Sequence, residues 1–391
     1  MAVQVASLGC RMNLAEGERL RALLGGADDL VVVNSCAVTA EAVRQTRQTI
    51  RRLRRANPDA RLIVTGCAAE TDRAALAGMS EVDGLVGNAG KLDPRAWNVP
   101  AVPPQVRPGA YTRAYVPVQN GCDHACTFCI IPQGRGPSRS VPLAEAVATV
   151  ARHHAAGAAE VVLTGGDLTS WGHDLPGAPA LGTLVAEILR AVPGLPRLRL
   201  SSVDGIELDP LLCELIGTEP RLMPHLHLSL QHGHDLILKR MKRRHTMAQT
   251  HALVAALRAG RPDLALGADL IAGFPTEDET MHRASLAAIA ELQLVHAHIF
   301  PFSPRPGTPA ARMPQLPREV VRARAAELRA AVAEVRLAWL HSLRGRALSV
   351  LAESDGTGHA ENFAQVRLAP GTPRGQIVTV IPDRIVEGLL A

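Results

Sequence analysis

The sequence predicts an α/β protein in three parts. These are an N-terminal parallel α/β sheet domain (residues 1–100), a central partial (β/α)6 barrel (108–340) and a small C-terminal all-β barrel (343–391). Three observations predict this arrangement. Short β-branched runs alternate with helical patterns over most of the chain, which is typical of parallel sheets. Proline gathers in residues 99–108, as in a linker between domains. Short strands with Gly, Asp and Pro turns follow the last long helix.

The first part contains three expected strands, each followed by a helical pattern or a turn. The strands are Val3–Ser7, Leu30–Asn34 and Arg61–Thr65. One helix is expected at Leu14–Leu24. A second begins after Thr39, whose hydroxyl can cap it, runs to about Arg55 and is ended by Asn57-Pro58.

The central part repeats the alternation on a larger scale. Six strands are expected at Tyr115–Gln119, Glu160–Thr164, Arg197–Ser202, His225–Leu230, Ala265–Ile271 and His296–Pro301. Six such units indicate a partial barrel rather than a closed barrel of eight. Thr276 with Glu279 is expected to form a capping box for the helix at Glu279–Leu292.

The last part begins after a long helix expected at Arg318–Leu343. Short strands are then expected at Leu348–Ala352, Phe363–Leu368 and Gln376–Ile381. A segment this small cannot cover a sheet with helices, which favours a small all-β barrel.

Charge and composition limit the class of protein. The 391 residues include 42 basic and 37 acidic side chains, a formal net charge of +5, which permits an anionic partner such as RNA. No targeting peptide and no apolar run of about 18–20 residues is visible, so we expect a cytoplasmic protein that does not span a membrane. An odd count of seven cysteines argues against a disulfide framework.

The strongest motif is Cys122-Asp-His-Ala-Cys126-Thr-Phe-Cys129, directly after the first strand of the central part. Reactive groups of α/β barrels lie at the carboxyl ends of strands. Three thiolates in one loop can hold three irons of a [4Fe–4S] cluster and leave the fourth open to a chelating substrate. The alternatives are a zinc site completed by His124 and a redox pair of Cys126 and Cys129.

This spacing resembles the radical S-adenosylmethionine (SAM) superfamily. The resemblance implies that Cys122, Cys126 and Cys129 bind a [4Fe–4S] cluster that in turn binds SAM. Other segments resemble the family's SAM contacts: an aromatic near the adenine, a glycine-rich turn, a polar strand end and an apolar turn. The residues so assigned are Phe128, Thr164, Gly165, Gly166, Asp167, Ser201, Ser202, Gln231, Ile271, Gly273 and Phe274.

A second cysteine set is expected in the first part. Cys10, Cys36 and Cys67 each follow a predicted strand. Parallel strands end at one edge of a sheet, so these thiols are expected to converge and to bind a second [4Fe–4S] cluster. The alternative is three unrelated buried cysteines, as we expect for Cys213 in its helix.

Together the cysteine contexts resemble the methylthiotransferase family. Several segments look most like its threonylcarbamoyladenosine tRNA branch: Cys36-Ala-Val-Thr39, Val86-Gly-Asn88, Gly134-Arg-Gly-Pro-Ser-Arg-Ser140, Ser201-Ser-Val-Asp204, Met223-Pro-His-Leu-His227, Leu236-Ile-Leu-Lys-Arg-Met-Lys242 and Phe300-Pro-Phe-Ser-Pro-Arg-Pro-Gly-Thr308. The end of the chain resembles a TRAM RNA-binding domain.

The resemblance implies a tRNA methylthiotransferase that places a methylthio group at C2 of N6-threonylcarbamoyladenosine, at position 37 beside the anticodon. One SAM would donate a methyl group, and a second would be cleaved to a 5′-deoxyadenosyl radical. The implied partners are a tRNA anticodon stem-loop, a one-electron donor and a sulfur donor, and we expect a monomer. Two alternatives stay open. One is another acceptor, either isopentenyl-adenosine tRNA or a ribosomal protein side chain. The other is a non-catalytic iron–sulfur protein that binds RNA or senses redox state.

Some residues depart from the family pattern, and others could bind a metal or RNA. Gln133, His232 and His234 stand where the family usually has other residue types, which bears on substrate contacts. His225 and His227 share one face of a strand and could bind a metal. Two basic stretches could attract RNA phosphates: Arg44, Arg47, Arg51, Arg54 and Arg55 on one helix, and the run Lys239, Arg240, Lys242, Arg243 and Arg244.

Overall fold

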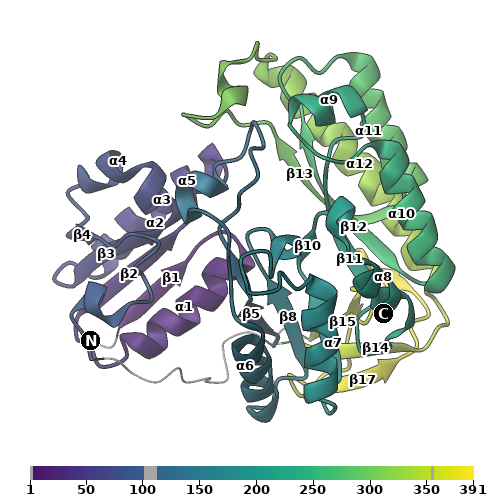
Figure 1. The fold of residues 1–391 in the computed structure, drawn as a ribbon, viewed down its shortest axis with the longest axis horizontal. Helices are drawn as coiled ribbons and strands as arrows, with labels where there is room; N and C mark the ends of the chain where they lie inside the picture. The colour runs from purple at the N-terminus through teal and green to yellow at the C-terminus, as the bar shows by residue number, and fades with distance from the viewer. Residues whose placement is uncertain (1–2, 101–111, 354–355) are drawn as a thin grey trace.

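The computed structural model describes residues 3–100, 112–353 and 356–391. Most of the predicted proline-rich linker, and with it the boundary between residues 100 and 108, lies outside the described residues. Figure 1 shows the N-terminal sheet in purple and blue, the central strands in teal and green, and the C-terminal strands in yellow beneath the central strands. The three predicted parts therefore occur in the predicted order.

The N-terminal part is a parallel sheet with strand order β1-β2-β3-β4. Its strands are β1 (Gln4–Ser7), β2 (Leu30–Ser35), β3 (Arg61–Gly66) and β4 (Gly84–Leu85). Its helices are α1 (Arg11–Leu23), α2 (Ala40–Ala56), α3 (Cys67–Thr71), α4 (Arg73–Ala77) and the 3-10 turn η1 (Pro94–Trp97). Ser7 lies opposite Asn34 and Ser35 lies opposite Gly66, so the first three strands end at one edge.

Local chemistry explains the bounds of α2. The Thr39 side chain accepts a hydrogen bond from the Ala42 amide, and Asn57 ends the helix. Both were predicted. The α2 face that contains Ile50 packs on β2 and β3, where Val33 and Val64 are fully buried. This apolar contact fixes the helix against the sheet.

The central strands form a partial barrel of six positions, as predicted. The strands are β5 (Ala114–Pro117), β8 (Glu160–Thr164), β9 (Arg197–Leu200), β10 (Ser202–Val203), β11 (His225–Gln231), β12 (Ala265–Ala272) and β13 (Leu294–Pro301). Ser201 separates β9, which pairs with β8, from β10, which pairs with β11. One interrupted strand therefore joins a three-stranded and a four-stranded sheet into one parallel series.

Helices cover the outside of this series (Figure 1). They are α6 (Leu143–Ala155), α7 (Leu181–Ala191), α8 (Pro210–Thr218), α9 (Asp235–Arg240), α10 (Met247–Gly260), α11 (Glu279–Glu291) and α12 (Arg318–Ser342), with 3-10 turns η2 (Leu168–Ser170), η3 (Gly205–Glu207) and η4 (Pro309–Arg312). Between β5 and α6 lie β6 (Gln119–Asn120), α5 (Ile131–Arg135) and β7 (Arg139–Ser140). Within the described residues, every helix is too short or too polar to cross a lipid bilayer.

The predicted capping box at Thr276 is wrong. Thr276 has φ of +68°, which turns the chain before the helix, and the Asp278 side chain caps α11 by accepting from the Met281 amide. A capping box does form one helix earlier, between Thr246 and Gln249 at the start of α10. The spacing of Thr276 and Glu279 predicted the wrong N-cap, because Thr276 itself lies in a left-handed turn before the helix begins.

The C-terminal part is all-β, as predicted, in the order β17-β14-β15-β16-β19-β18. The strands are β14 (Leu348–Ala352), β15 (Thr357–Ala360), β16 (Gln365–Arg367), β17 (Ile377–Val380), β18 (Ile385–Val386) and β19 (Leu389–Leu390). Phe363, predicted to begin a strand, instead lies in a turn with φ of +70°. Its ring lies 4.8 Å from the His225 ring of β11 and so fastens this sheet to the barrel.

Candidate active site: a cavity lined by a cysteine loop and Cys10

The cysteine loop begins at a sharp turn after β6. Gly121 has φ of +77°, and a Cβ there would lie 1.9 Å from the carbonyl oxygen of Pro137. Only glycine fits this turn. The turn leads directly into Cys122, which is buried, while Cys126 and Cys129 are half-buried. All three line a cavity of about 330 Å³.

The sulfurs of Cys122 and Cys129 accept backbone hydrogen bonds and are partly shielded from water. The backbone amides of His124 and Ile131 each donate to a cysteine sulfur at 3.4 Å, the first to Cys122 and the second to Cys129. Burial raises the pKa of Cys122 to about 12 and that of Cys129 to about 11. Thiols this basic stay protonated in water, and they become thiolates when a cation such as iron replaces the proton. A three-cysteine cluster therefore fits this loop.

His124 has a different partner from the one that a zinc site would require. Its Nε2 lies 2.7 Å from Asp167 Oδ2 and 3.5 Å from Glu207 Oε2. These hydrogen bonds raise the pKa of His124 to about 10, which favours the protonated ring. Cys122, His124 and Asp167 lie close enough to share an ion. Asp167 and Glu207 hold His124 Nε2, and a zinc site that used this nitrogen would have to break these contacts, which disfavours the zinc alternative.

The wall of the cavity contains most of the residues assigned to SAM. Gly165 and Gly166 follow β8, and a Cβ on Gly166 would lie 2.6 Å from the Gly121 carbonyl oxygen. The Asp167 amide donates to Gln119 Oε1 at 2.8 Å, which holds this turn against the start of the cysteine loop. The assigned residues that line the cavity are Phe128, Gly165, Gly166, Asp167, Ser202, Gln231 and Ile271.

Four assigned residues, all within the described part of the chain, lie behind this wall. Thr164 is the buried last residue of β8, and Ser201 lies between β9 and β10. Gly273 has φ of +69° and donates its amide to Glu277. Phe274 is fully buried, with its ring 6.5 Å from Phe128 in an edge contact. Their positions suit supporting the cavity wall rather than contacting a ligand.

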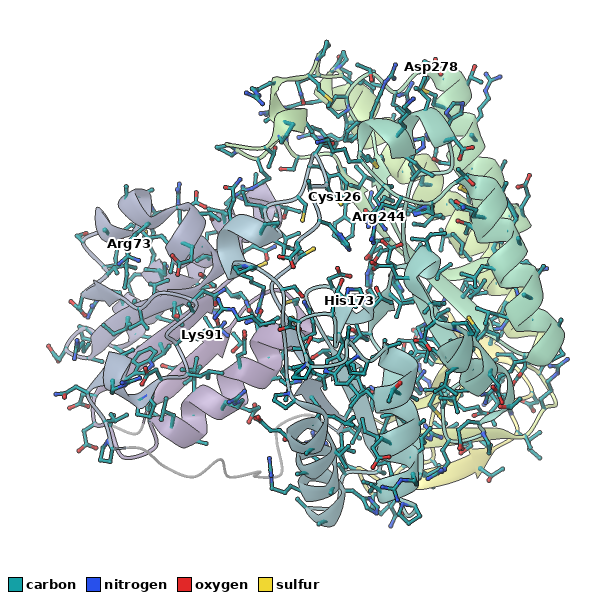
Figure 2. The ribbon with its side chains drawn as sticks, viewed as in Figure 1. Arg73, Lys91, Cys126, His173, Arg244 and Asp278 are labelled. Carbon is teal, nitrogen blue, oxygen red and sulfur yellow. The ribbon has the colours of Figure 1, made fainter. Side chains whose placement is uncertain are left out.

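Part of the second basic run points inward, contrary to its interpretation as an RNA surface. Arg243 donates to Asp204 at 2.8 Å, and its Nη1 lies 3.7 Å from Cys126 Sγ. Arg244 donates to Glu207 at 2.6 Å. Figure 2 shows Cys126 and Arg244 at the centre of the molecule, between the N-terminal sheet and the barrel. The sequence did not predict these ion pairs, because a run of basic residues does not show which carboxylates its members contact in the fold.

The first basic stripe is also partly used within the protein. Arg54 donates to the backbone carbonyls of Glu81 and Ala60 and pairs with Asp83. Its guanidinium therefore ties α2 to the start of β4. An exposed basic helix face was the simpler interpretation, and for this residue it is wrong.

The second cysteine set converges as predicted. Cys10, Cys36 and Cys67 follow β1, β2 and β3 at the common edge of the sheet. A Cβ on Gly9, which has φ of +87°, would lie 2.5 Å from Cys36 Sγ. Burial raises the pKa of Cys36 to about 11, and the nearby sulfurs of Cys10 and Cys67 add to this. Cys10 lines the same cavity as Cys122, Cys126 and Cys129.

A buried ionic network that the sequence did not reveal supports this set. Arg135 of α5 pairs with Glu16 of α1 at 3.0 Å, and Lys91 pairs with the same carboxylate. Burial alone would raise the pKa of Glu16, but Lys91 and Arg135 hold that pKa below its usual range. The Asn88 side-chain amide lies 3.8 Å from Cys67 Sγ. The two cationic groups outnumber the one carboxylate, which suits neighbouring thiolates.

The residues that depart from the family pattern have structural partners. His232 is buried with its Nε2 3.2 Å from Glu277, and His234 accepts from the Leu236 amide to cap α9. Gln133 lies beside Gly307. Cys213 is half-buried on α8 and packs against the core, as predicted. The two histidines thus stabilise the loops around the cavity.

Comparisons with known proteins agree with this geometry. The Radical SAM superfamily model matches residues 116–287, and the model of the uncharacterized protein family UPF0004 matches residues 2–87. A threonylcarbamoyladenosine tRNA methylthiotransferase MtaB of Rickettsia prowazekii is 41% identical over 99% of this chain and 96% of its own. A tRNA-2-methylthio-N(6)-dimethylallyladenosine synthase of Chloroflexus aurantiacus is 35% identical over 90% of this chain and 82% of its own.

The solved structures support the fold. A radical S-adenosylmethionine methyltransferase, TsrM, from Kitasatospora setae has a TM-score of 0.60 over 79% of this chain and 76% of its own, at 17% identity. Likeness at this identity shows the arrangement of strands and helices alone. The sequence relatives, matched over nearly the full length, decide the family. The chain is a member of the radical SAM tRNA methylthiotransferase family of enzymes.

Proposed function

We propose that this enzyme adds a methylthio group to C2 of N6-threonylcarbamoyladenosine beside the anticodon of tRNA. The observation that carries the proposal is the single cavity that Cys10 shares with Cys122, Cys126 and Cys129. Two chemistries needed for one product, sulfur delivery and hydrogen abstraction, would then meet at one substrate. The choice of acceptor rests on the 41% identical relative, whose name specifies threonylcarbamoyladenosine.

Each cysteine set has the number of thiols that a site-differentiated cluster needs. We assign one [4Fe–4S] cluster to Cys122, Cys126 and Cys129 and a second to Cys10, Cys36 and Cys67. When bound, the first supplies the electron that cleaves SAM and the second supplies an open iron for the transferred sulfur. Electrons and sulfur come from external donors.

The protein's own residues would bind and orient the reactants. Gly165 and Gly166 lack side chains, so their turn packs directly against Leu168 and Gly121 and lies beside the cysteine loop, where SAM would bind. Phe128 and Ile271 offer apolar surface to the adenine ring. Arg243, 3.7 Å from Cys126 Sγ, offsets negative charge on that sulfur. The apolar part of the lining would limit access of water once the reactants are bound, which would protect reactive species from side reactions.

We propose that tRNA approaches the cavity with its anticodon loop, whose unpaired bases leave the stack at little cost. The C-terminal sheet, which resembles a TRAM domain, is the proposed auxiliary contact. Residues 343–391 contain five arginines and five acidic residues, so this sheet adds no net charge. We therefore expect its contribution to depend only weakly on salt. We expect a cytoplasmic monomer.

The test is nucleoside analysis of tRNA. A bacterial strain that lacks its own enzyme would be complemented with this chain, and its tRNA nucleosides separated by mass. We expect 2-methylthio-N6-threonylcarbamoyladenosine to appear. The matched control is the Cys122→Ala, Cys126→Ala, Cys129→Ala triple variant, which should leave the nucleoside unmodified. A methylthio group on dimethylallyladenosine instead would show that this nucleoside, and not threonylcarbamoyladenosine, is the acceptor.

In vitro, reconstituted enzyme with SAM, tRNA and dithionite should form 5′-deoxyadenosine. Intact clusters without SAM cleavage would favour the non-catalytic alternative, an RNA-binding or redox-sensing protein. A change in a ribosomal protein without any change in tRNA would indicate the protein acceptor.

A further inference from the structure

The barrel strands β11 and β13 contain an unusual set of imidazoles. His225 and His227 are two residues apart on β11 and share one face of the strand, and His296 and His298 do the same on β13. Their rings lie close together: His227 and His298 have centroids 4.8 Å apart, and His225 and His296 have centroids 5.5 Å apart. Such positions in α/β barrels are usually filled by branched aliphatic side chains. Four imidazoles here need a separate explanation.

The imidazoles of His227 and His298 both contact the carboxylate of Asp269. Asp269 lies on β12, between the two histidine strands, and is directly opposite His298 in the sheet register. Its Oδ1 lies 3.1 Å from His227 Nε2 and 2.9 Å from His298 Nδ1. The donor atoms of all three residues lie within 4.8 Å of one another. Three adjacent parallel strands thus bring two nitrogens and one oxygen to a single point.

Neighbouring residues make room for this arrangement. Gly267 is on β12 two residues before Asp269, and a Cβ there would lie 2.5 Å from His227 Nδ1. Any larger residue would displace the His227 ring from Asp269. Asp269 also lines the cavity that contains the cysteine sulfurs. The carboxylate therefore faces the space where reactants bind.

The set matches the chemistry of a divalent transition metal. Imidazole and carboxylate are common ligands of Zn²⁺ and Fe²⁺, with bonds of about 2.0–2.2 Å. Ligand atoms around a tetrahedral ion at that range lie about 3.3 Å apart. The two hydrogen-bond distances to Asp269 are close to this value. Two histidines and one carboxylate also leave positions open for water or substrate.

We propose that His227, Asp269 and His298 bind one divalent transition-metal ion, separate from both cysteine sets, in the wall of the cavity. The set contains no cysteine, so the ion's occupancy can be distinguished from cluster iron by element and by count. The proposal stands whichever tRNA nucleoside is the acceptor.

The experiment is zinc binding to the enzyme with its clusters in place. The probe is Zn²⁺ alone, and zinc and iron per chain are counted together after desalting. We expect one zinc per chain with the iron count unchanged. Asp269→Asn and His298→Ala should each weaken zinc binding at least tenfold. The His298 side chain is 64% exposed, so its replacement is not expected to disturb the fold.

The matched control is His251→Ala on α10, where the half-exposed ring faces Glu291 rather than the barrel. This variant should bind zinc as the unchanged enzyme does. The proposal is overturned if the unchanged enzyme retains no zinc, because the three side chains would then form only a hydrogen-bonded cluster. It is equally overturned if His298→Ala and Asp269→Asn bind zinc normally, or if zinc binds only as iron is lost.

Discussion

Arg135 Nη2 lies 3.8 Å from Cys10 Sγ, although the two residues are 125 positions apart in the chain. The same guanidinium pairs with Glu16, so it links the central part to α1 of the N-terminal part. Both members of the ion pair are almost fully buried. One side chain therefore joins two parts of the protein and places positive charge at the edge of a cysteine set.

Replacing Arg135 with Ala should destabilise the protein and weaken iron binding at Cys10, Cys36 and Cys67. Removing one partner of a buried ion pair costs about 3–5 kcal/mol, because the other charge stays buried. The midpoint of thermal unfolding and the iron count would both fall. Arg139→Ala, on the exposed neighbouring strand β7, is the control. An unchanged midpoint in Arg135→Ala would contradict this role.

The two cysteine sets should lose iron independently. Reconstituted enzyme is expected to contain about eight irons per chain, as two cubic clusters require. Replacing Cys10, Cys36 and Cys67 together with Ala should leave about four and should preserve SAM cleavage. The control is Cys213→Ser, which lies on α8 away from both sets and should keep all the iron. About four irons in the unchanged enzyme would show that the first set binds no cluster.

Glu160 should stabilise the fold in a pH-dependent manner. Its carboxylate is fully buried and pairs with Arg113 at 2.6 Å and Arg199 at 3.0 Å. Burial alone would raise the pKa of Glu160, but Arg199 and Arg113 hold that pKa at about 2, below the ordinary 4.5. A depressed pKa in the folded state gives stability that is present above about pH 4.5 and lost as the pH falls towards about 2.

Glu160→Gln should therefore lower the free energy of unfolding at pH 7 by about 3–5 kcal/mol, the cost of removing the charge that faces buried Arg199 and Arg113. The difference between the two proteins should shrink between about pH 4.5 and about pH 2. Urea unfolding of cluster-free protein across this range measures it. A difference that is constant with pH would mean that the charge of Glu160 contributes nothing.

Glu277 should position the apolar turn beside the proposed SAM site. Its Oε2 accepts from the Gly273 and Phe274 amides, and Arg324 donates to its Oε1 at 2.9 Å. In Glu277→Gln, an amide NH2 can replace the acceptor that faces these donors. We expect SAM to bind at least tenfold more weakly, measured by equilibrium dialysis. Glu279→Gln, which alters an exposed neighbour, is the control and should bind SAM normally.

Much of the fold could be predicted because its signals are local. The β-branched run at Leu30–Asn34 gave strand β2, and Thr39 with Asn57 gave both ends of α2. Where a backbone turn intervened, local reasoning failed. Thr276 and Phe363 both have positive φ, and neither residue type indicates such a backbone conformation in the sequence. His232 and His234 departed from a family pattern, and only their hydrogen-bond partners in the fold explain them.

The sequence by itself determined the fold class, the convergence of Cys10, Cys36 and Cys67, and the cysteine loop at Cys122–Cys129. Each depends on strand ends and short spacings, which are properties of neighbouring residues. Only the tertiary structure decided that Cys10 lies in the same cavity as the cluster loop. It also decided that Arg243 points inward to Asp204. The reason is physical: a buried charge is placed by partners far away in the chain, and sequence spacing contains no record of them.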